Sequence, residues 1–212
     1  MHSYQEWIKA FEKLIEQYKG QKHALDYKNL YQIMVMVVLS AQDSDAKING
    51  IAPSLFAKFP NMRSLSKAST GDIVEEIKSV RGHLKKAAWL QEIAQTLKID
   101  KNIPQNMKEL TALKGIGRKS ANVILRAAGA PAEGILVDLH VIRVAPRLGI
   151  TKNVDATKIE KDLMEVLPQE MWSEVGMSMS FLGREICRPT NPMHSECVMN
   201  YICDYCKAHK NN

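Results

Sequence analysis

The sequence predicts an all-helical protein, and three observations carry this prediction. Apolar residues recur at helical spacing in most segments, hardly any segment alternates as a strand would, and the loops between helical patterns are short. The 212 residues are 45% hydrophobic and 25% charged, as in ordinary globular proteins. This length suffices for one large domain or two small ones.

The first twenty residues predict an amphipathic helix rather than a signal peptide, because their apolar residues are spaced and not continuous. Acidic Glu6, Glu12 and Glu16 share its polar face, which argues against a membrane-surface helix. No apolar run reaches the roughly 18 residues of a membrane span, so we expect no membrane partner. The apolar stripe expected to pack in the core consists of Trp7, Ile8, Phe11, Leu14, Ile15 and Tyr18.

The next patterns predict helices in the first half of the chain. Residues 31–42 are apolar over a long run, and the lack of a partner strand favours a helix buried on all sides. Residues 70–80 predict a helix with Thr70 as its cap, and residues 84–97 predict another.

The second half continues the helical pattern. A helix within residues 102–113 begins at a possible capping box formed by Asn106 and Glu109. Three further helices are expected, one from Asp138 through Leu148, one from Asp155 through Leu167 and one over residues 170–187. With loops of typical length, the chain accommodates about ten short helices.

The segment LTALKGIGRKSANVIL, residues 110–125, has the glycines and basic residues of a phosphate-binding loop. A nucleotide P-loop is excluded, because Gly115 and Gly117 are too close, Arg118 separates Gly117 from Lys119, and a helix precedes the turn. The remaining pattern is helix, tight turn, helix. Its backbone amides could hold a nucleic-acid backbone of any sequence, or the glycines could serve only to turn the chain. The net charge of +6 is compatible with a polyanionic partner.

Four segments together resemble one known family. These are LKGIGRKSANV (residues 113–123), VDLHVIRV (137–144), LSAQ (39–42) and the cysteine-bearing C-terminal segment. They are similar to the motifs of the helix-hairpin-helix DNA glycosylases, and within these to the endonuclease III branch. The resemblance covers nearly the whole chain.

This resemblance implies a two-lobed, all-α helix-hairpin-helix fold with a C-terminal metal cluster loop. One six-helix lobe would span residues 24–132, with the hairpin at about 113–117. The other would join residues 1–23 to 133–212 and contain the cluster loop, 187–206. The implied protein is a monomer in the cytoplasm of a prokaryote, associated with the nucleoid.

The implied activity is base-excision repair of double-stranded DNA with damaged or abasic sites. A bifunctional DNA glycosylase and AP lyase acting on oxidised pyrimidines is expected. Two alternatives stay open: a monofunctional glycosylase of the same fold, such as an adenine glycosylase, and a non-catalytic DNA-binding module.

The resemblance places the catalytic lysine at Lys119 and the catalytic aspartate at Asp138, facing each other at the lobe boundary. An uncharged amine can attack the electron-poor C1′ of the sugar and form a Schiff base. A lysine near the positive end of a helix suits this attack. An aspartate can stabilise the developing charge and move protons. Asp138 would also be an N-cap.

Rotation of a nucleotide out of the duplex leaves a gap that side chains must fill. Gln42 matches the family residue that enters this gap. The family has a second residue that wedges into this gap, and the corresponding loop here is VRGHLKKA. The family register places this wedge at Gly82 or His83, and Leu84 is the alternative if the loop shifts. Other DNA-contacting residues expected from the motifs are Lys114, Gly115, Gly117, Arg118, Ser120 and His140.

All four cysteines of the chain lie in its last 26 residues, which favours a metal site over disulfides in an intracellular protein. The family spacing for a 4Fe–4S cluster falls on Cys187, His194, Cys197 and Cys203, and Cys206 is an additional cysteine. The fourth ligand is therefore either His194 or Cys206, and structural zinc is an alternative to iron. Arg188, inside this loop, could meet a phosphate.

Overall fold

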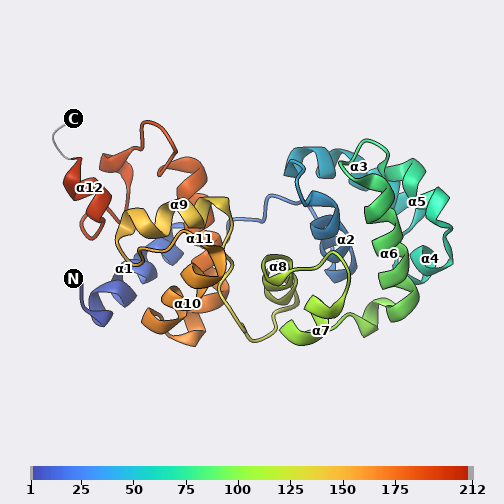
Figure 1. Ribbon diagram of the computed structural model, residues 1–212, viewed down its shortest axis with the longest axis horizontal. Helices are drawn as coiled ribbons and strands as arrows, with labels where there is room; N and C mark the ends of the chain where they lie inside the picture. The colour runs from blue at the N-terminus through green and yellow to red at the C-terminus, as the bar shows by residue number, and fades with distance from the viewer. Residues whose placement is uncertain (1, 210–212) are drawn as a thin grey trace. The chain divides into compact units, whose positions relative to one another are not determined.

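The computed structural model describes residues 2–209, and every regular element among them is a helix, as the sequence predicts (Figure 1). The chain forms two compact units. The central unit consists of Lys22–Ala130, and the terminal unit combines Met1–Gln21 with Pro131–Asn212. Among the described residues, none of the helices has the length and hydropathy that a membrane crossing requires.

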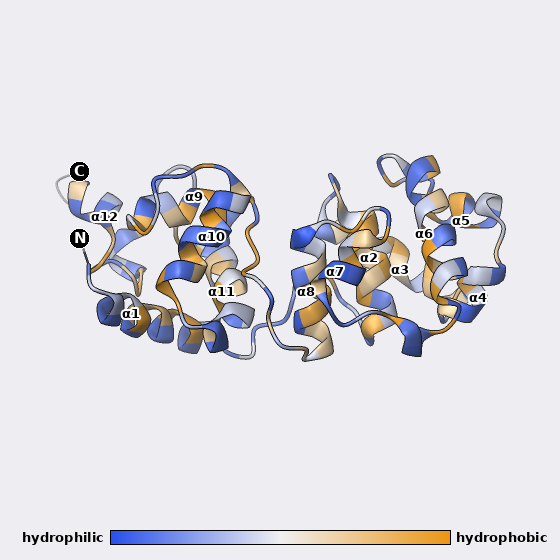
Figure 2. Cartoon of the chain, turned by 60° about the horizontal axis from the view of Figure 1, so that its bottom comes forward, coloured by the Kyte–Doolittle hydropathy of each residue, from blue (hydrophilic) through white to orange (hydrophobic). Residues whose placement is uncertain are grey.

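The core of the central unit is built around α2 (Leu30–Ser40), which is buried along nearly its whole length. Hydrophobic residues dominate this helix in Figure 2. The helix packs against α3, α6 and α8. The helices around it are α3 (Asp45–Lys58), α4 (Met62–Lys67), α5 (Thr70–Ile77), α6 (His83–Leu97), α7 (Met107–Ala112) and α8 (Arg118–Ala128), with the 3₁₀ turn η1 (Asp100–Asn102) between α6 and α7.

Two predictions about this unit are wrong in detail. The helix expected over residues 31–42 ends at Ser40, because Ala41 leaves the helical conformation with ψ 114° and Gln42 follows in the left-handed region with φ +62°. The cap of α5 is Ser69 rather than Thr70. The Ser69 hydroxyl accepts the Asp72 N–H, and the Thr70 hydroxyl instead donates to the Gln91 side chain.

The terminal unit is centred on α11 (Trp172–Glu185), which packs against α1 (Tyr4–Gln17) and α9 (Leu139–Leu148). Gly176 lets the extended segment before α9 lie directly on α11, because a Cβ there would come within 2.4 Å of the Leu136 carbonyl oxygen. This contact fixes the chain just ahead of Asp138. The remaining elements are α10 (Ala156–Val166), α12 (Asp204–Ala208) and the 3₁₀ turns η2 (Gln169–Met171) and η3 (His194–Glu196).

Candidate functional site

The turn between α7 and α8 is a tight hairpin. Its chain reversal is held by the Ile116 N–H, which donates to the Leu113 carbonyl over 3.2 Å, and Ile116 itself is buried. Gly115 has φ +81°, and a Cβ at this position would lie 2.6 Å from Trp89 Cε3. Both the conformation and the close approach of the Trp89 ring therefore require glycine here.

Lys119 is the second residue of α8, and its side chain is exposed. The N-cap is Gly117, which has no side chain, so no capping oxygen covers the amides of the first turn. Amides at a helix N-terminus attract an anion. Arg118 is exposed and Ser120 half-buried beside Lys119.

Lys114, on the same turn, is partly engaged by the protein itself. Its ammonium group lies 2.8 Å from a Glu92 carboxylate oxygen, and both side chains are exposed. An exposed pair of this kind contributes little to stability, so a phosphate could displace the Glu92 contact.

Asp138, in the terminal unit, is the N-cap of α9, as predicted. One carboxylate oxygen accepts the N–H groups of His140 and Val141, at 2.8 and 2.9 Å. The other accepts the Ser180 hydroxyl from α11 over 2.6 Å. The side chain is buried and held at both oxygens, which fixes its orientation.

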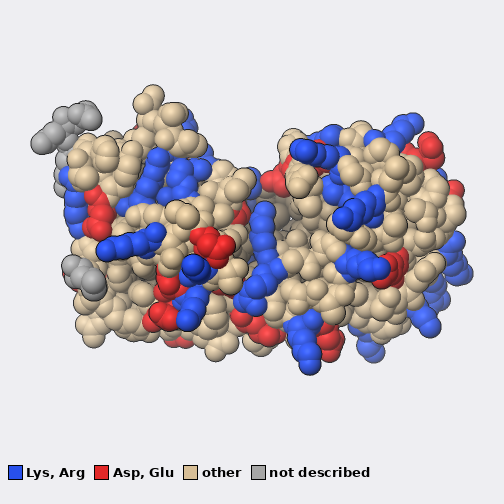
Figure 3. Space-filling view, in the orientation of Figure 1, with Lys and Arg blue, Asp and Glu red and all other residues tan. Residues whose placement is uncertain are grey.

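His140 and Arg143 link α9 to the end of α11. The Arg143 guanidinium donates to the carbonyls of Gly183 and Cys187 and lies 3.2 Å from His140 Nδ1. Lys and Arg side chains gather on the side of the terminal unit where α9 lies (Figure 3). A basic surface over α9 is suited to a phosphate backbone.

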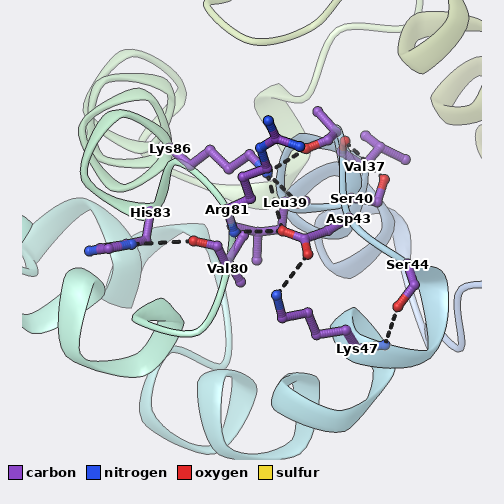
Figure 4. A network of polar contacts seen from close by, with 11 residues as sticks. Val37, Leu39, Ser40, Asp43, Ser44, Lys47, Val80, Arg81, His83 and Lys86 are labelled. Carbon is purple, nitrogen blue, oxygen red and sulfur yellow. Dashed lines mark hydrogen bonds and ion pairs between the residues drawn. The ribbon is translucent and has the colours of Figure 1, made fainter.

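Gln42 lies on a loop of the central unit, and His83 is the first residue of α6. Gln42 is exposed, directly after the end of α2. The His83 ring is turned back onto its own loop, with Nδ1 3.3 Å from the Val80 carbonyl oxygen (Figure 4). The next residue, Leu84, is a large apolar side chain that is 65% exposed. Of the two, Leu84 is the more exposed side chain.

The four cysteines line one small cavity together with His194, Ile186, Pro192, Met193 and Tyr205. Cys203 and Cys206 are buried, and Cys187 and Cys197 are half-buried. Within residues 2–209, no three His, Cys, Asp or Glu side chains are gathered as tightly as around a single metal ion.

The thiols of this cavity are close enough to influence one another. Burial raises the pKa of Cys197 to about 11, and the neighbouring Cys203, Cys187 and Cys206 add to this rise. Burial likewise raises the pKa of Cys203. Arg147 of α9 places a guanidinium N–H 3.4 Å from Cys187 Sγ. Four thiols that line one cavity, with an arginine beside one of them, fit a site in which deprotonated cysteines hold a metal.

His194 lines the same cavity, but its ring is part of an aromatic stack. It lies parallel to the Tyr205 ring, with centroids 5.8 Å apart, and Tyr205 stacks in turn on His209 at 4.0 Å. The Arg147 guanidinium covers the Tyr205 ring at 4.5 Å. The ring of His194 thus already has an aromatic packing partner, whereas Cys206 offers a buried thiol.

Sequence reasoning misses several residues that support these groups. Ser180 and Arg147 act on Asp138 and on the cysteine cavity from elements far away in the sequence. A buried lysine, Lys86, holds the end of α2 together with Asp43 (Figure 4). The only signal for Lys86 in the sequence is its place near the end of the segment VRGHLKKA, residues 80–87.

The chain is similar to known proteins over most of its length. Residues 35–169 match the model of the HhH-GPD superfamily of base excision DNA repair proteins. The endonuclease III of Synechocystis sp. is 35% identical over 193 residues, which is 90% of this chain and 88% of that protein. Two solved structures, a non-covalent endonuclease III–DNA complex and a trapped endonuclease III–DNA covalent intermediate with an estranged adenine, each have a TM-score of 0.85 and 30% identity, with full coverage of both chains.

Proposed function

The chain belongs to the HhH-GPD superfamily of base excision DNA repair proteins, and we propose that it removes oxidised pyrimidines from duplex DNA and then nicks the abasic strand. The observation that carries this proposal is the lysine at the second position of α8, directly after the glycine hairpin. The relative whose intermediate was trapped is an endonuclease III joined covalently to DNA. Its relatives include the endonuclease III proteins of two bacteria, Synechocystis sp. and Bacillus subtilis, and we propose that this chain acts on DNA in the cytoplasm.

Lys119 is proposed as the nucleophile. Its Nζ forms a bond to C1′ of the damaged nucleotide, and the base leaves with the electron pair of the glycosidic bond. After the sugar ring opens, the amine and C1′ form a Schiff base. The iminium acidifies the C2′ proton, and its removal breaks the C3′–O bond, so the 3′ phosphate leaves with that electron pair.

Asp138 is proposed to stabilise the positive charge that develops on the sugar and to move protons during the reaction. Its orientation is fixed before substrate arrives, because His140 and Val141 amides hold one oxygen and Ser180 the other. A preorganised carboxylate does not need to be ordered during the reaction. Its cap role and its proposed catalytic role use the same geometry.

The hairpin and α9 are proposed to bind the DNA backbone. Gly117, with open space where a Cβ would lie, allows close approach of a phosphate, and Gly115 makes the turn that presents the backbone. Arg118 and Ser120 flank this position at the start of α8. These contacts carry no base specificity, so they would hold any sequence. His140 is proposed to contribute from α9, on the basic side of the terminal unit.

Gln42 and Leu84 are proposed to fill the gap left by the extruded nucleotide. Leu84 is preferred to His83 because its apolar side chain is exposed, whereas the His83 ring contacts the Val80 carbonyl. An exposed leucine at a helix start has the apolar surface that wedges between bases use.

For the cluster, we favour Cys187, Cys197, Cys203 and Cys206 as ligands. Thiolates are the usual ligands of a 4Fe–4S cluster, all four line one cavity, and the His194 ring is stacked on Tyr205. When bound, the cluster would fix the loop over residues 187–206. Arg147 would complete the site, because its guanidinium offsets the negative charge of thiolates. Arg188 is exposed on the loop and is proposed to meet a phosphate.

The ligand set is tested by metal content and visible absorption of purified variants. Cys206→Ala is expected to lose bound iron, and the matched variant His194→Ala is expected to keep it. The reverse result would assign His194 as the fourth ligand. Stoichiometric zinc in place of iron would identify a structural zinc site.

The function is tested with a panel of duplexes containing thymine glycol, dihydrouracil, 8-oxoguanine, uracil or an abasic site. Base release and strand cleavage are measured separately. The proposal expects release of thymine glycol and dihydrouracil, coupled to nicking. Release without nicking would indicate a monofunctional glycosylase, and binding without either would leave a DNA-binding module.

A further inference from the structure

Both neighbours of Gln42 in the chain are held by residues of a second segment. The Lys86 ammonium, on α6, donates to the carbonyls of Leu39 and Ala41 at 2.7 and 2.6 Å (Figure 4). These carbonyls lie at the C-terminal end of α2, where carbonyls have no partner within the helix. Lys86 is only 5% exposed, so its ammonium group contacts the end of α2 rather than solvent.

Asp43 holds the chain on the other side of Gln42. One carboxylate oxygen accepts the backbone N–H of Arg81 over 2.6 Å and lies 3.9 Å from Lys86 Nζ. The other accepts the Lys47 ammonium over 2.8 Å. Asp43 therefore ties the loop of Gln42 to the loop that leads, through Gly82, to Leu84.

Gln42 itself adopts φ +62°, which a residue with a Cβ seldom does. Such a conformation persists only where the surrounding structure holds it. The Lys86 contact at Ala41 and the Asp43 contact at Arg81 provide this restraint. The strain is thus located at the residue that the proposed function assigns to the DNA gap.

We propose that Asp43 and Lys86 are positioning residues that hold Gln42 and Leu84 as one preformed unit for insertion into the duplex. This inference rests on the proposed function. Neither side chain needs to touch the DNA. Their effect is that the loop of Gln42 and the first turn of α6, with Leu84, enter the gap without first being ordered, which lowers the cost of base extrusion.

The test compares a reaction that requires a gap with one that does not. Single-turnover excision of dihydrouracil from a duplex requires insertion, whereas nicking of a single-stranded abasic oligonucleotide has no opposite strand and no gap. For Asp43→Ala, we expect about a tenfold loss on the duplex and less than a twofold change on the single strand. The control is Lys47→Met, which removes only the exposed partner of Asp43 and should change neither rate.

A second readout needs no chemistry. Wild-type protein, saturating on a duplex with a tetrahydrofuran abasic analogue, should raise the fluorescence of a 2-aminopurine placed opposite, because the base is unstacked. Asp43→Ala should give less than half of this rise at saturation. Asp43→Asn keeps an acceptor for the Arg81 N–H and is expected to retain most of this rise. If the alanine variant does not fold, Asp43→Leu, which keeps the side-chain volume but accepts no hydrogen bond, takes its place and should give less than half of the rise.

Equal losses on duplex and single strand would show a purely structural role and overturn the inference. Unchanged duplex excision in Asp43→Ala would overturn the inference as well. If folded Asp43→Asn loses as much duplex excision as Asp43→Ala, the hydrogen bond to the Arg81 N–H is not what positions the loop. If wild-type protein neither excises nor nicks, the proposed function fails first, and this outcome is visible before any variant is compared.

Discussion

Replacing Asp138 separates its role as a helix cap from its proposed role in the reaction. Asp138→Asn retains an amide oxygen, which can accept the N–H groups of both His140 and Val141. Its NH₂ group would face Ser180, whose hydroxyl can rotate to accept instead of donate. Asp138→Ala removes all three contacts.

The expected cost in stability follows from these contacts. Loss of an N-cap costs about 1 kcal/mol, and a buried hydroxyl left without a partner costs roughly 1–3 kcal/mol. Because Ser180 is only 2% exposed, water does not replace the carboxylate there. We therefore expect Asp138→Ala to lose about 2–4 kcal/mol, a fall in Tm of roughly 5–15 °C for a chain of this length. Asp138→Asn should stay within about 1 kcal/mol of the wild type.

The assay pairs thermal unfolding with single-turnover excision of dihydrouracil, measured well below both melting temperatures. If the carboxylate moves protons or stabilises charge, both variants lose activity by roughly 10²-fold or more, although only alanine loses stability. An asparagine variant within threefold of the wild-type rate would refute this reasoning and leave Asp138 as a cap alone.

Two further predictions concern the hairpin and the wedge. Gly115→Ala should destabilise the protein by about 2–5 kcal/mol in denaturant unfolding, since it adds the left-handed penalty and a contact with Trp89. Gly117→Ala, with open space around the added methyl, should keep a free energy of unfolding within about 1 kcal/mol of the wild type but bind DNA more weakly. Equal losses of stability in Gly115→Ala and Gly117→Ala would contradict the geometry. Leu84→Ser should reduce the rate of duplex excision by about tenfold, because the apolar contact that offsets the cost of unstacking the bases is lost. His83→Ala should change this rate by less than about threefold. A larger loss in the histidine variant would make His83 the wedge.

Helices with a clear apolar stripe and a polar cap are predictable from the sequence. The caps Asn106, Asp138 and Asp155 are confirmed, since each side chain accepts an N–H of the first turn. Helix α3 is not singled out by the pattern, because Gly50 and Pro53 interrupt it. Ser69 and Thr70 are adjacent hydroxyl residues, and only the backbone geometry decides which one caps α5.

The candidate site is predictable where a motif is contiguous, as for Lys119 in GRKS. Contacts between distant segments are not. Asp43 and Lys86 are separated by 43 positions, and neither belongs to a pattern that would pair them. Spacing also leaves the fourth cluster ligand undecided, since His194 has the family register and Cys206 the usual chemistry. The structure adds the stacking of the His194 ring on Tyr205, which the spacing of residues in the sequence does not predict.

The central claim is that the amine of Lys119 forms a covalent bond with the sugar. Borohydride reduction during reaction with abasic duplex DNA traps such a Schiff base as a stable protein–DNA adduct. The wild type and the control Lys108→Ala, which alters an exposed lysine of α7, should both give the adduct, and Lys119→Ala should give none. An adduct of undiminished yield in Lys119→Ala would contradict the assignment, and no adduct in the wild type would remove the lyase activity altogether.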